Sequence, residues 1–190
     1  MRKSPILQLY KSKDTVFTAR EIALIWREDD LDRLKNKIKY YLGKGDLIRL
    51  RRGVYAKSGY DVKEAAVQIY KPSYISFETV LSSVGITFQY YDTIFVASYL
   101  SREIILNDGQ KIRYRKLKND VLLNDKGVMQ KNGIAIASVE RAFLDMIYVN
   151  PKYYFDNLSV IDWEKCFRLA GIYKNRSLIK IVSNYYKQNA

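Results

Sequence analysis

The sequence predicts an α+β protein in two parts, residues 1–60 and residues 61–190. Within residues 30–57, apolar residues recur every three or four positions, and two short runs joined by a glycine follow, which is the pattern of a helix and a β-hairpin. In residues 61–190, short β-branched runs are interspersed with segments of helical period, as in a mixed α/β domain. Ser58-Gly59-Tyr60-Asp61 marks the predicted boundary.

The helix predicted from Leu31 has one apolar face and one basic face. Asp30 can cap its start, and Gly43 or Gly45 can end it. Its apolar side chains follow a three-four spacing: Leu31, Leu34, Ile38, Tyr41 and Leu42. The opposite face and its flanks hold the candidate DNA contacts Arg33, Asn36, Lys37, Lys39 and Tyr40.

The hairpin predicted over residues 47–57 is also basic, with Arg51-Arg52-Gly53 at its turn. A helix followed by a basic hairpin is typical of a winged helix-turn-helix. The helix fits the major groove of DNA, about 12 Å wide, and the hairpin reaches neighbouring phosphates. The further candidate contacts are Lys44, Arg49, Arg51 and Arg52. The alternative is a solvated basic surface without a nucleic-acid partner.

Two helices are predicted ahead of this element. Residues 4–12 are amphipathic, with Pro5 in the first turn. Thr18 and Glu21 form a predicted capping box at the start of a helix that would pack behind the DNA-contacting helix. The first amides of that helix, together with Arg20, could hold a backbone phosphate, or Thr18 could serve only as a cap.

Composition limits the possible functions. The net charge of +13 favours a polyanionic partner. The absence of histidine removes imidazole chemistry, and the single cysteine, Cys166, cannot form an internal disulfide or a thiolate zinc site. No apolar run is long enough for a signal peptide or a membrane span, so we expect a cytoplasmic protein. We also expect no metal and no cofactor.

The second part is predicted to contain short strands and several helices. A helix over residues 62–70 ends before Pro72, and another is capped by Ser76 and ends at Gly85. The remaining elements are a strand over 93–99, a hairpin of 103–106 and 111–117, a strand over 134–137, a Ser138-capped helix over 139–148, and helices over 162–170 and 176–187.

One strand of this part carries a second basic patch. Its apolar residues alternate with Lys111, Arg113, Arg115, Lys116 and Lys118. The patch could contact DNA beside the main site or an RNA-bearing partner. Alternatively, it is a solvated edge strand that its charges protect from aggregation.

Catalysis needs a constellation of residues that the sequence does not show, so we expect a protein that is not an enzyme. The acids available to a metal-dependent nuclease are Glu78, Asp92, Glu103, Glu140 and Asp145, with Lys111 on a strand paired to Glu103. Ion pairs with neighbours such as Arg141 would explain the helical acids equally well.

Four segments, in order, resemble the AbiEi antitoxins of bacterial type IV toxin-antitoxin and abortive-infection systems. They are Phe17-Thr18-Ala19-Arg20-Glu21, Arg52-Gly53-Val54-Tyr55, residues 72–81 (PSYISFETVL), and residues 137–145 (ASVERAFLD). The resemblance implies a winged helix that represses its own promoter by binding inverted repeats. It also implies a C-terminal domain that counters a nucleotidyltransferase-like toxin without a stable complex.

By position, the resemblance maps the groove contacts to Arg33, Asn36, Lys37 and Tyr40 and the hairpin contacts to Arg49, Arg51 and Arg52. The motifs of the C-terminal domain map to Ser76, Glu78, Ser138, Glu140, Arg141 and Asp145. Two other hypotheses stay open. One is a winged-helix transcription factor whose second part senses a ligand, and the other is a nuclease with a DNA-targeting head.

Overall fold

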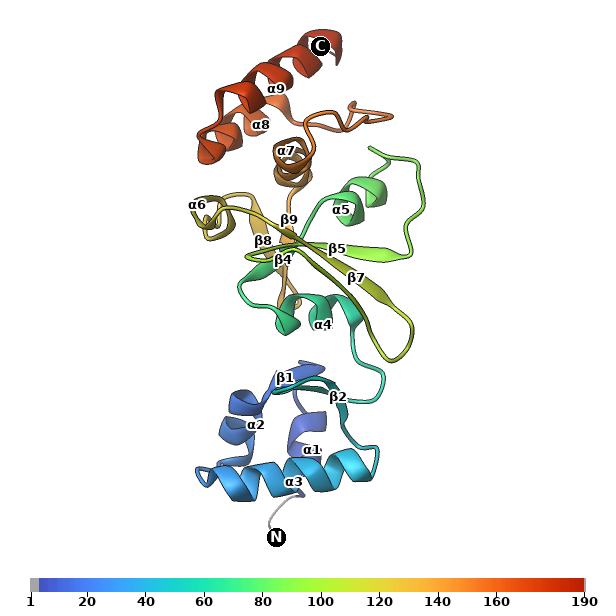
Figure 1. Ribbon diagram of the computed structural model, residues 1–190, viewed down its shortest axis with the longest axis vertical. Helices are drawn as coiled ribbons and strands as arrows, with labels where there is room; N and C mark the ends of the chain where they lie inside the picture. Colours follow the sequence, from blue (N-terminus) through green and yellow to red (C-terminus); the bar gives the residue numbers. More distant parts are fainter. Residues whose placement is uncertain (1–3, 190) are drawn as a thin grey trace. The chain divides into compact units, whose positions relative to one another are not determined.

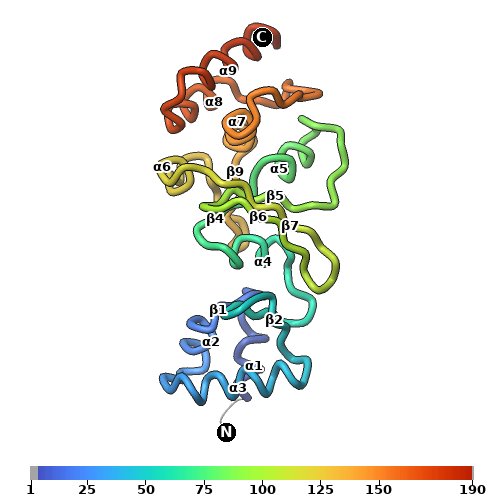
Figure 2. Tube along the Cα trace, in the orientation of Figure 1, coloured from blue at the N-terminus to red at the C-terminus, as the bar shows by residue number. Residues whose placement is uncertain are grey.

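The computed structural model describes residues 4–189 of an α+β chain (Figure 1). The chain divides into two compact units, residues 1–69 (unit 1) and residues 70–190 (unit 2), and Figure 2 traces the backbone through both. The predicted fold class is confirmed.

Unit 1 combines four helices with a small antiparallel sheet. In chain order the elements are α1 (Pro5–Tyr10), β1 (Val16–Thr18), α2 (Ala19–Trp26), α3 (Leu31–Gly43), β2 (Ile48–Arg51), β3 (Val54–Ala56) and α4 (Val62–Ile69). The sheet has the strand order β1-β3-β2. Three residues of the predicted apolar stripe of α3, Leu34, Ile38 and Tyr41, are buried in a core shared with α2 and the sheet. Leu42 is partly buried, whereas Leu31 in the first turn is exposed, contrary to the prediction. That shared core orients the opposite face of α3 outward.

The predicted capping box at Thr18 and the predicted cap at Asp30 are present in unit 1, whereas the Ser4 side chain makes no capping hydrogen bond to α1. The backbone N–H of Glu21 donates to the Thr18 hydroxyl (3.2 Å), and the Glu21 carboxylate accepts from the Thr18 N–H (2.6 Å). Asp30 accepts from the N–H groups of Asp32 and Arg33 at the start of α3. Strand β1 was not predicted, because its three residues gain their pairing only from β3, far along the chain.

The predicted boundary after Tyr60 is corrected, because α4 belongs to unit 1. The Glu64 carboxylate accepts hydrogen bonds from the Thr15 N–H (2.9 Å), the Thr15 hydroxyl (2.6 Å) and the Val16 N–H (3.0 Å). At the other end of the helix, Arg51 Nη1 donates to the Ile69 carbonyl (2.7 Å). These contacts attach both ends of α4 to the small sheet.

Unit 2 is built on one mixed sheet of strand order β6-β7-β5-β4-β9-β8. The β4–β9 and β5–β7 pairs are parallel, and the other neighbouring pairs are antiparallel. Figure 1 shows α7 between the sheet and the pair α8 and α9. The elements are β4 (Ser73–Ile75), α5 (Glu78–Ser83), β5 (Thr93–Ser98), β6 (Arg102–Ile105), β7 (Lys111–Lys116), α6 (Asn119–Leu122), β8 (Val128–Lys131), β9 (Ile134–Ala137), α7 (Val139–Val149), α8 (Trp163–Ala170), η1 (Gly171–Tyr173) and α9 (Arg176–Asn189).

Two predictions for unit 2 are wrong, and one strand was not predicted. Ser76 does not cap a helix, because residues 73–75 form β4 and Phe77 precedes α5. Strand β8 was not predicted in its polar, glycine-containing segment. The basic strand β7 lies between β6 and β5, so the edge-strand interpretation fails. The hairpin of β6 and β7 and the Ser138-capped helix α7 are confirmed.

Candidate nucleic-acid interface

The face of α3 opposite its buried stripe is exposed and largely basic. Of the predicted contacts on this helix, Arg33, Asn36, Lys39 and Tyr40 are exposed. Lys44 follows the helix, and its ammonium lies 4.7 Å from the centroid of the Tyr40 ring. Tyr40 therefore presents its ring together with a positive charge.

Lys37 occupies a different environment from the one predicted. Its side chain is partly buried, and its ammonium forms an ion pair with Glu28 in the turn between α2 and α3. The hydrogen bond from Lys37 lowers the pKa of the Glu28 carboxyl, which keeps the pair charged. This contact fixes the turn, so Lys37 is better placed to orient α3 than to contact a base.

A groove of about 370 Å³ runs along one side of α3. Three basic side chains line it, Lys35 and Lys39 one turn apart on α3 and Arg49 on β2. Arg49 is placed 6.0 Å from the centroid of the Tyr55 ring. The remaining lining residues are Ala19, Leu31, Leu34, Ile38 and Tyr55. The groove thus has an apolar floor and a basic rim, and it meets the first residue of α2.

Lys35 was missed by the sequence analysis, although a signal existed. It is spaced four residues from Lys39, and both belong to the same side of the helix. The prediction concentrated on the centre of the polar face, which lies between Asn36 and Tyr40. Lys35 currently pairs with exposed Asp32 at 3.0 Å, a contact that is weak at this exposure.

The two arginines of the hairpin turn have separate roles. Arg51 donates to the Ile69 carbonyl and so holds the end of α4. Arg52 is exposed, and its turn is adjacent to α2, since the Ala19 N–H donates to the Gly53 carbonyl at 2.9 Å. Arg20, also exposed, follows Ala19 directly. The hairpin turn and the start of α2 therefore form one edge of unit 1.

The predicted basic patch of unit 2 is partly neutralised. Arg113 pairs with Glu103 at 2.5 Å, and Arg115 pairs with Glu78 at 2.6 Å. Lys111, Lys116 and Lys118 are exposed. The Arg113–Glu103 pair is exposed and therefore weak, but Arg115 is held by a buried carboxylate, so it contributes less to attracting a nucleic acid than the sequence suggested.

Three residues of the predicted C-terminal motif, Ser76, Arg141 and Asp145, belong to a buried network, whereas Glu78 and Glu140 pair with Arg115 and Lys165. Asp145 and Arg141 are fully buried on α7, with Arg141 Nε 3.4 Å from Asp145 Oδ1. The Asp145 carboxylate accepts hydrogen bonds from Ser76 (2.7 Å), Tyr74 (3.0 Å) and Tyr173 (2.6 Å). Burial raises the pKa of the Tyr74 and Tyr173 hydroxyls, so both remain protonated donors.

Arg141 extends the network into the connection between α6 and β8. Its guanidinium donates to the Val121 carbonyl (2.6 Å) and the Lys126 carbonyl (2.8 Å). A buried, hydrogen-bonded network of this kind specifies how segments pack, because any unpaired member would be costly. The network joins β4, α6, α7 and η1.

The carboxylates considered for a nuclease do not converge. Four of them pair with different basic side chains: Glu78 with Arg115, Glu103 with Arg113, Glu140 with Lys165, and Asp145 with Arg141. Among residues 4–189, no three His, Cys, Asp or Glu side chains form a group that could hold a metal ion. Within the described part of the chain, the nuclease hypothesis has no assembled set of metal ligands.

Comparison with known proteins adds evidence on the fold. No family model and no curated relative matches the sequence. A solved structure, the Rv2827c protein from Mycobacterium tuberculosis, is similar, with a TM-score of 0.53 and 9% sequence identity, covering 94% of this chain and 73% of that chain. Across the described residues, no helix has the length and apolar character needed to cross a membrane. At this identity the similarity shows a shared α+β fold.

Proposed function

We propose that this protein is a DNA-binding regulator whose unit 1 acts as a winged helix-turn-helix. The observation that carries the proposal is the exposed basic face of α3 beside a groove rimmed by Lys35, Lys39 and Arg49. The order α1-β1-α2-α3-β2-β3 supports it, because α2 and α3 are joined by a short turn and a two-stranded hairpin follows. In this proposal α3 enters the major groove.

The residues divide into base contacts and phosphate contacts. Asn36 suits adenine, and Arg33 suits guanine, because their side chains match the donor and acceptor patterns of those bases. Lys35, Lys39 and Arg49 would contact phosphates along one strand, and Arg20 and Arg52 would contact the backbone beside the hairpin. Lys37 and Arg51 would act indirectly, through the contacts that hold the α2–α3 turn and α4.

We further propose that the protein is the antitoxin of a type IV toxin-antitoxin pair. Support comes from the four segments that resemble AbiEi antitoxins. In this proposal unit 1 represses the shared promoter by binding inverted repeats, and unit 2 counters a nucleotidyltransferase-like toxin. The protein would act in the cytoplasm in abortive infection and phage defence, and not as an enzyme.

Fluorescence anisotropy tests the DNA-binding proposal. The probe is a duplex from the promoter region upstream of this gene, and the control is a shuffled duplex of equal length and composition. Specific binding should exceed non-specific binding by about 10³-fold or more. Equal affinity for both duplexes would remove the regulator proposal.

A growth assay tests the antitoxin proposal separately. The adjacent gene is induced alone, with this protein, and with a variant carrying both Arg33→Ala and Asn36→Ala. If the variant protects the cells as well as the natural chain does, neutralisation of the toxin does not depend on the base contacts of Arg33 and Asn36. An adjacent gene that is harmless when expressed alone would refute the antitoxin assignment and leave the DNA-binding proposal intact.

The pocket beside Glu78 and Arg115 favours a second candidate function, a transcription factor whose unit 2 senses a small molecule. A ligand that changes the affinity for the promoter duplex would support this candidate. An unchanged affinity at saturating ligand would count against it.

A further inference from the structure

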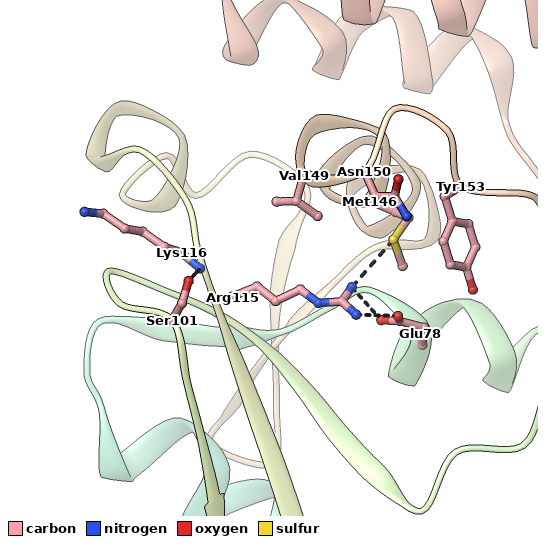
Figure 3. Close-up of a pocket in the computed structure, with 8 residues that line it drawn as sticks. All are labelled: Glu78, Ser101, Arg115, Lys116, Met146, Val149, Asn150 and Tyr153. Atoms are coloured by element: carbon pink, nitrogen blue, oxygen red, sulfur yellow. Dashed lines mark hydrogen bonds and ion pairs between the residues drawn. The ribbon is translucent and has the colours of Figure 1, made fainter.

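Unit 2 contains a pocket of about 350 Å³ that the DNA-binding proposal does not use. Figure 3 shows it between β7, the start of α5 and the end of α7. Its volume lies within the range of small-molecule sites, roughly 300–1,000 Å³. The lining residues are Glu78, Ser101, Arg115, Lys116, Met146, Val149, Asn150 and Tyr153.

Arg115 is held in one orientation in this pocket. Its two terminal nitrogens donate to the two carboxylate oxygens of Glu78, at 2.6 and 2.8 Å. The guanidinium carbon lies 5.0 Å from the centroid of the Phe77 ring and 4.7 Å from that of Phe95. Stacking and bidentate pairing together preorganise a planar cation. Arg115 Nη1 also donates to Met146 Sδ at 3.6 Å (Figure 3). A guanidinium has five N–H donors, so two of them remain beyond the two used by Glu78 and the one used by Met146.

The backbone beside this ion pair is strained. Phe77 has φ 55° and ψ −138°, which places a bulky residue in the left-handed region, between β4 and α5. The strained residue contributes its ring to Arg115, and the next residue, Glu78, contributes the carboxylate. Such strain persists where the surroundings over-determine it, and it clusters at ligand sites.

The side chains that line the pocket carry a net positive charge. Arg115 and Lys116 bring two positive charges against the single carboxylate of Glu78, which Arg115 already occupies. Ser101, Asn150 and Tyr153 add side chains that can donate. Figure 3 shows the Lys116 ammonium directed away from Arg115, and this exposed side chain can turn toward an anion. The lining therefore matches a ligand rich in acceptors and negatively charged.

We propose that this pocket binds a small molecule that carries a phosphate or carboxylate group. The anionic group is held by the remaining donors of Arg115 and by Lys116, and the apolar part packs against Met146 and Val149. Glu78 stays paired with Arg115 and keeps it in place. The proposal rests on residues of unit 2 alone, so it stands whether or not unit 1 binds DNA.

Isothermal titration calorimetry on the full chain tests the proposal. The phosphate probes are inorganic phosphate and the four nucleoside 5′-monophosphates, and the carboxylate probes are citrate and 4-hydroxybenzoate. Lys116→Glu reverses the charge at the rim, and Lys118→Glu is the matched control because it is exposed, makes the same charge change and does not line the pocket. We expect Lys116→Glu to weaken binding by roughly tenfold and Lys118→Glu to leave it unchanged.

A second variant, Val149→Trp, fills the pocket and should abolish binding, with thermal unfolding as the check that the variant folds. Three results would overturn the proposal: no probe binding the natural chain at about 10 mM, equal weakening by Lys116→Glu and Lys118→Glu, or no weakening by either. Should the tryptophan variant fail to fold, the pair of charge reversals decides.

Discussion

Arg51 donates a hydrogen bond to the main-chain carbonyl of Ile69, 18 residues along the chain and 2.7 Å away. The contact joins the turn of the hairpin to the last residue of α4. It separates two neighbouring arginines that the sequence presents as equivalent. Both side chains are exposed, but Arg51 stabilises unit 1 through this hydrogen bond, and Arg52 lies in the turn.

The Arg51–Ile69 contact predicts different outcomes for two single substitutions. Arg51→Ala should lower the free energy of unfolding of unit 1 by about 1 kcal/mol, because a charge-assisted hydrogen bond to a helix end is lost. Arg52→Ala should leave stability unchanged and weaken binding to the promoter duplex. Chemical denaturation and anisotropy measure the two effects, and the interpretation fails if both variants behave alike in both assays.

The basic groove predicts the salt dependence of DNA binding. Replacing both Lys35 and Lys39 with alanine should reduce the slope of log K against log salt by about 1.8, since each lost phosphate contact removes about 0.9. The control is Lys180→Ala combined with Lys187→Ala, which removes two exposed charges from α9. Equal slopes for the two double variants would exclude Lys35 and Lys39 from the phosphate contacts.

Substitution of a residue in the buried network of α7 should cause a large loss of stability. Asp145→Ala leaves the Arg141 guanidinium without its carboxylate and removes the acceptor of Ser76, Tyr74 and Tyr173. We expect destabilisation by about 3–5 kcal/mol. Tyr173→Phe removes one donor only and should cost about 1–2 kcal/mol. Urea denaturation ranks the variants, and an Asp145→Ala variant as stable as the natural chain would contradict the structural assignment.

The environment of Glu140 predicts how the stability of the fold depends on pH. Burial alone would raise the pKa of its carboxyl, but hydrogen bonds from Lys165, from its own backbone N–H and from Ser138 hold the pKa below the usual value of about 4.3. A lowered folded-state pKa contributes stability that is complete above the unfolded-state pKa. This stability is lost as the pH falls through the folded-state pKa.

Glu140→Gln should therefore flatten the decline in stability as the pH falls below about 4.3. The matched control is Glu164→Gln, because Glu164 pairs with Arg168 on the surface of α8, where solvent screens the pair. Thermal unfolding measured from neutral to acidic pH distinguishes the two. If the stability of both variants falls with pH as it does in the natural chain, the Glu140–Lys165 pair is not a source of acid sensitivity.

Local elements of this protein could be predicted from the sequence. Each of these elements depends on residues that are close together in the chain: the apolar stripe of α3, the Thr18–Glu21 capping box, the hairpin of β6 and β7, and the Ser138 cap of α7. Such features depend on backbone hydrogen bonds and side-chain periods that a short segment satisfies by itself. The exposed basic face of α3 followed from the same periodicity.

The tertiary structure decided which distant residues meet. β1 pairs with β3, β4 pairs with β9, and Glu78 meets Arg115, in each case through contacts between segments more than 30 residues apart. The tertiary structure also places α4 in unit 1 and brings Arg51 within hydrogen-bond distance of Ile69. It buries Arg141 and Asp145 of α7 in a network of polar side chains. No local pattern encodes these outcomes, because they depend on how sheets and helices pack around a shared core. The sequence by itself therefore determined most of the helices, the caps at Thr18, Asp30 and Ser138 and the basic face of α3. Packing decided which charged side chains stay exposed and which are buried in pairs.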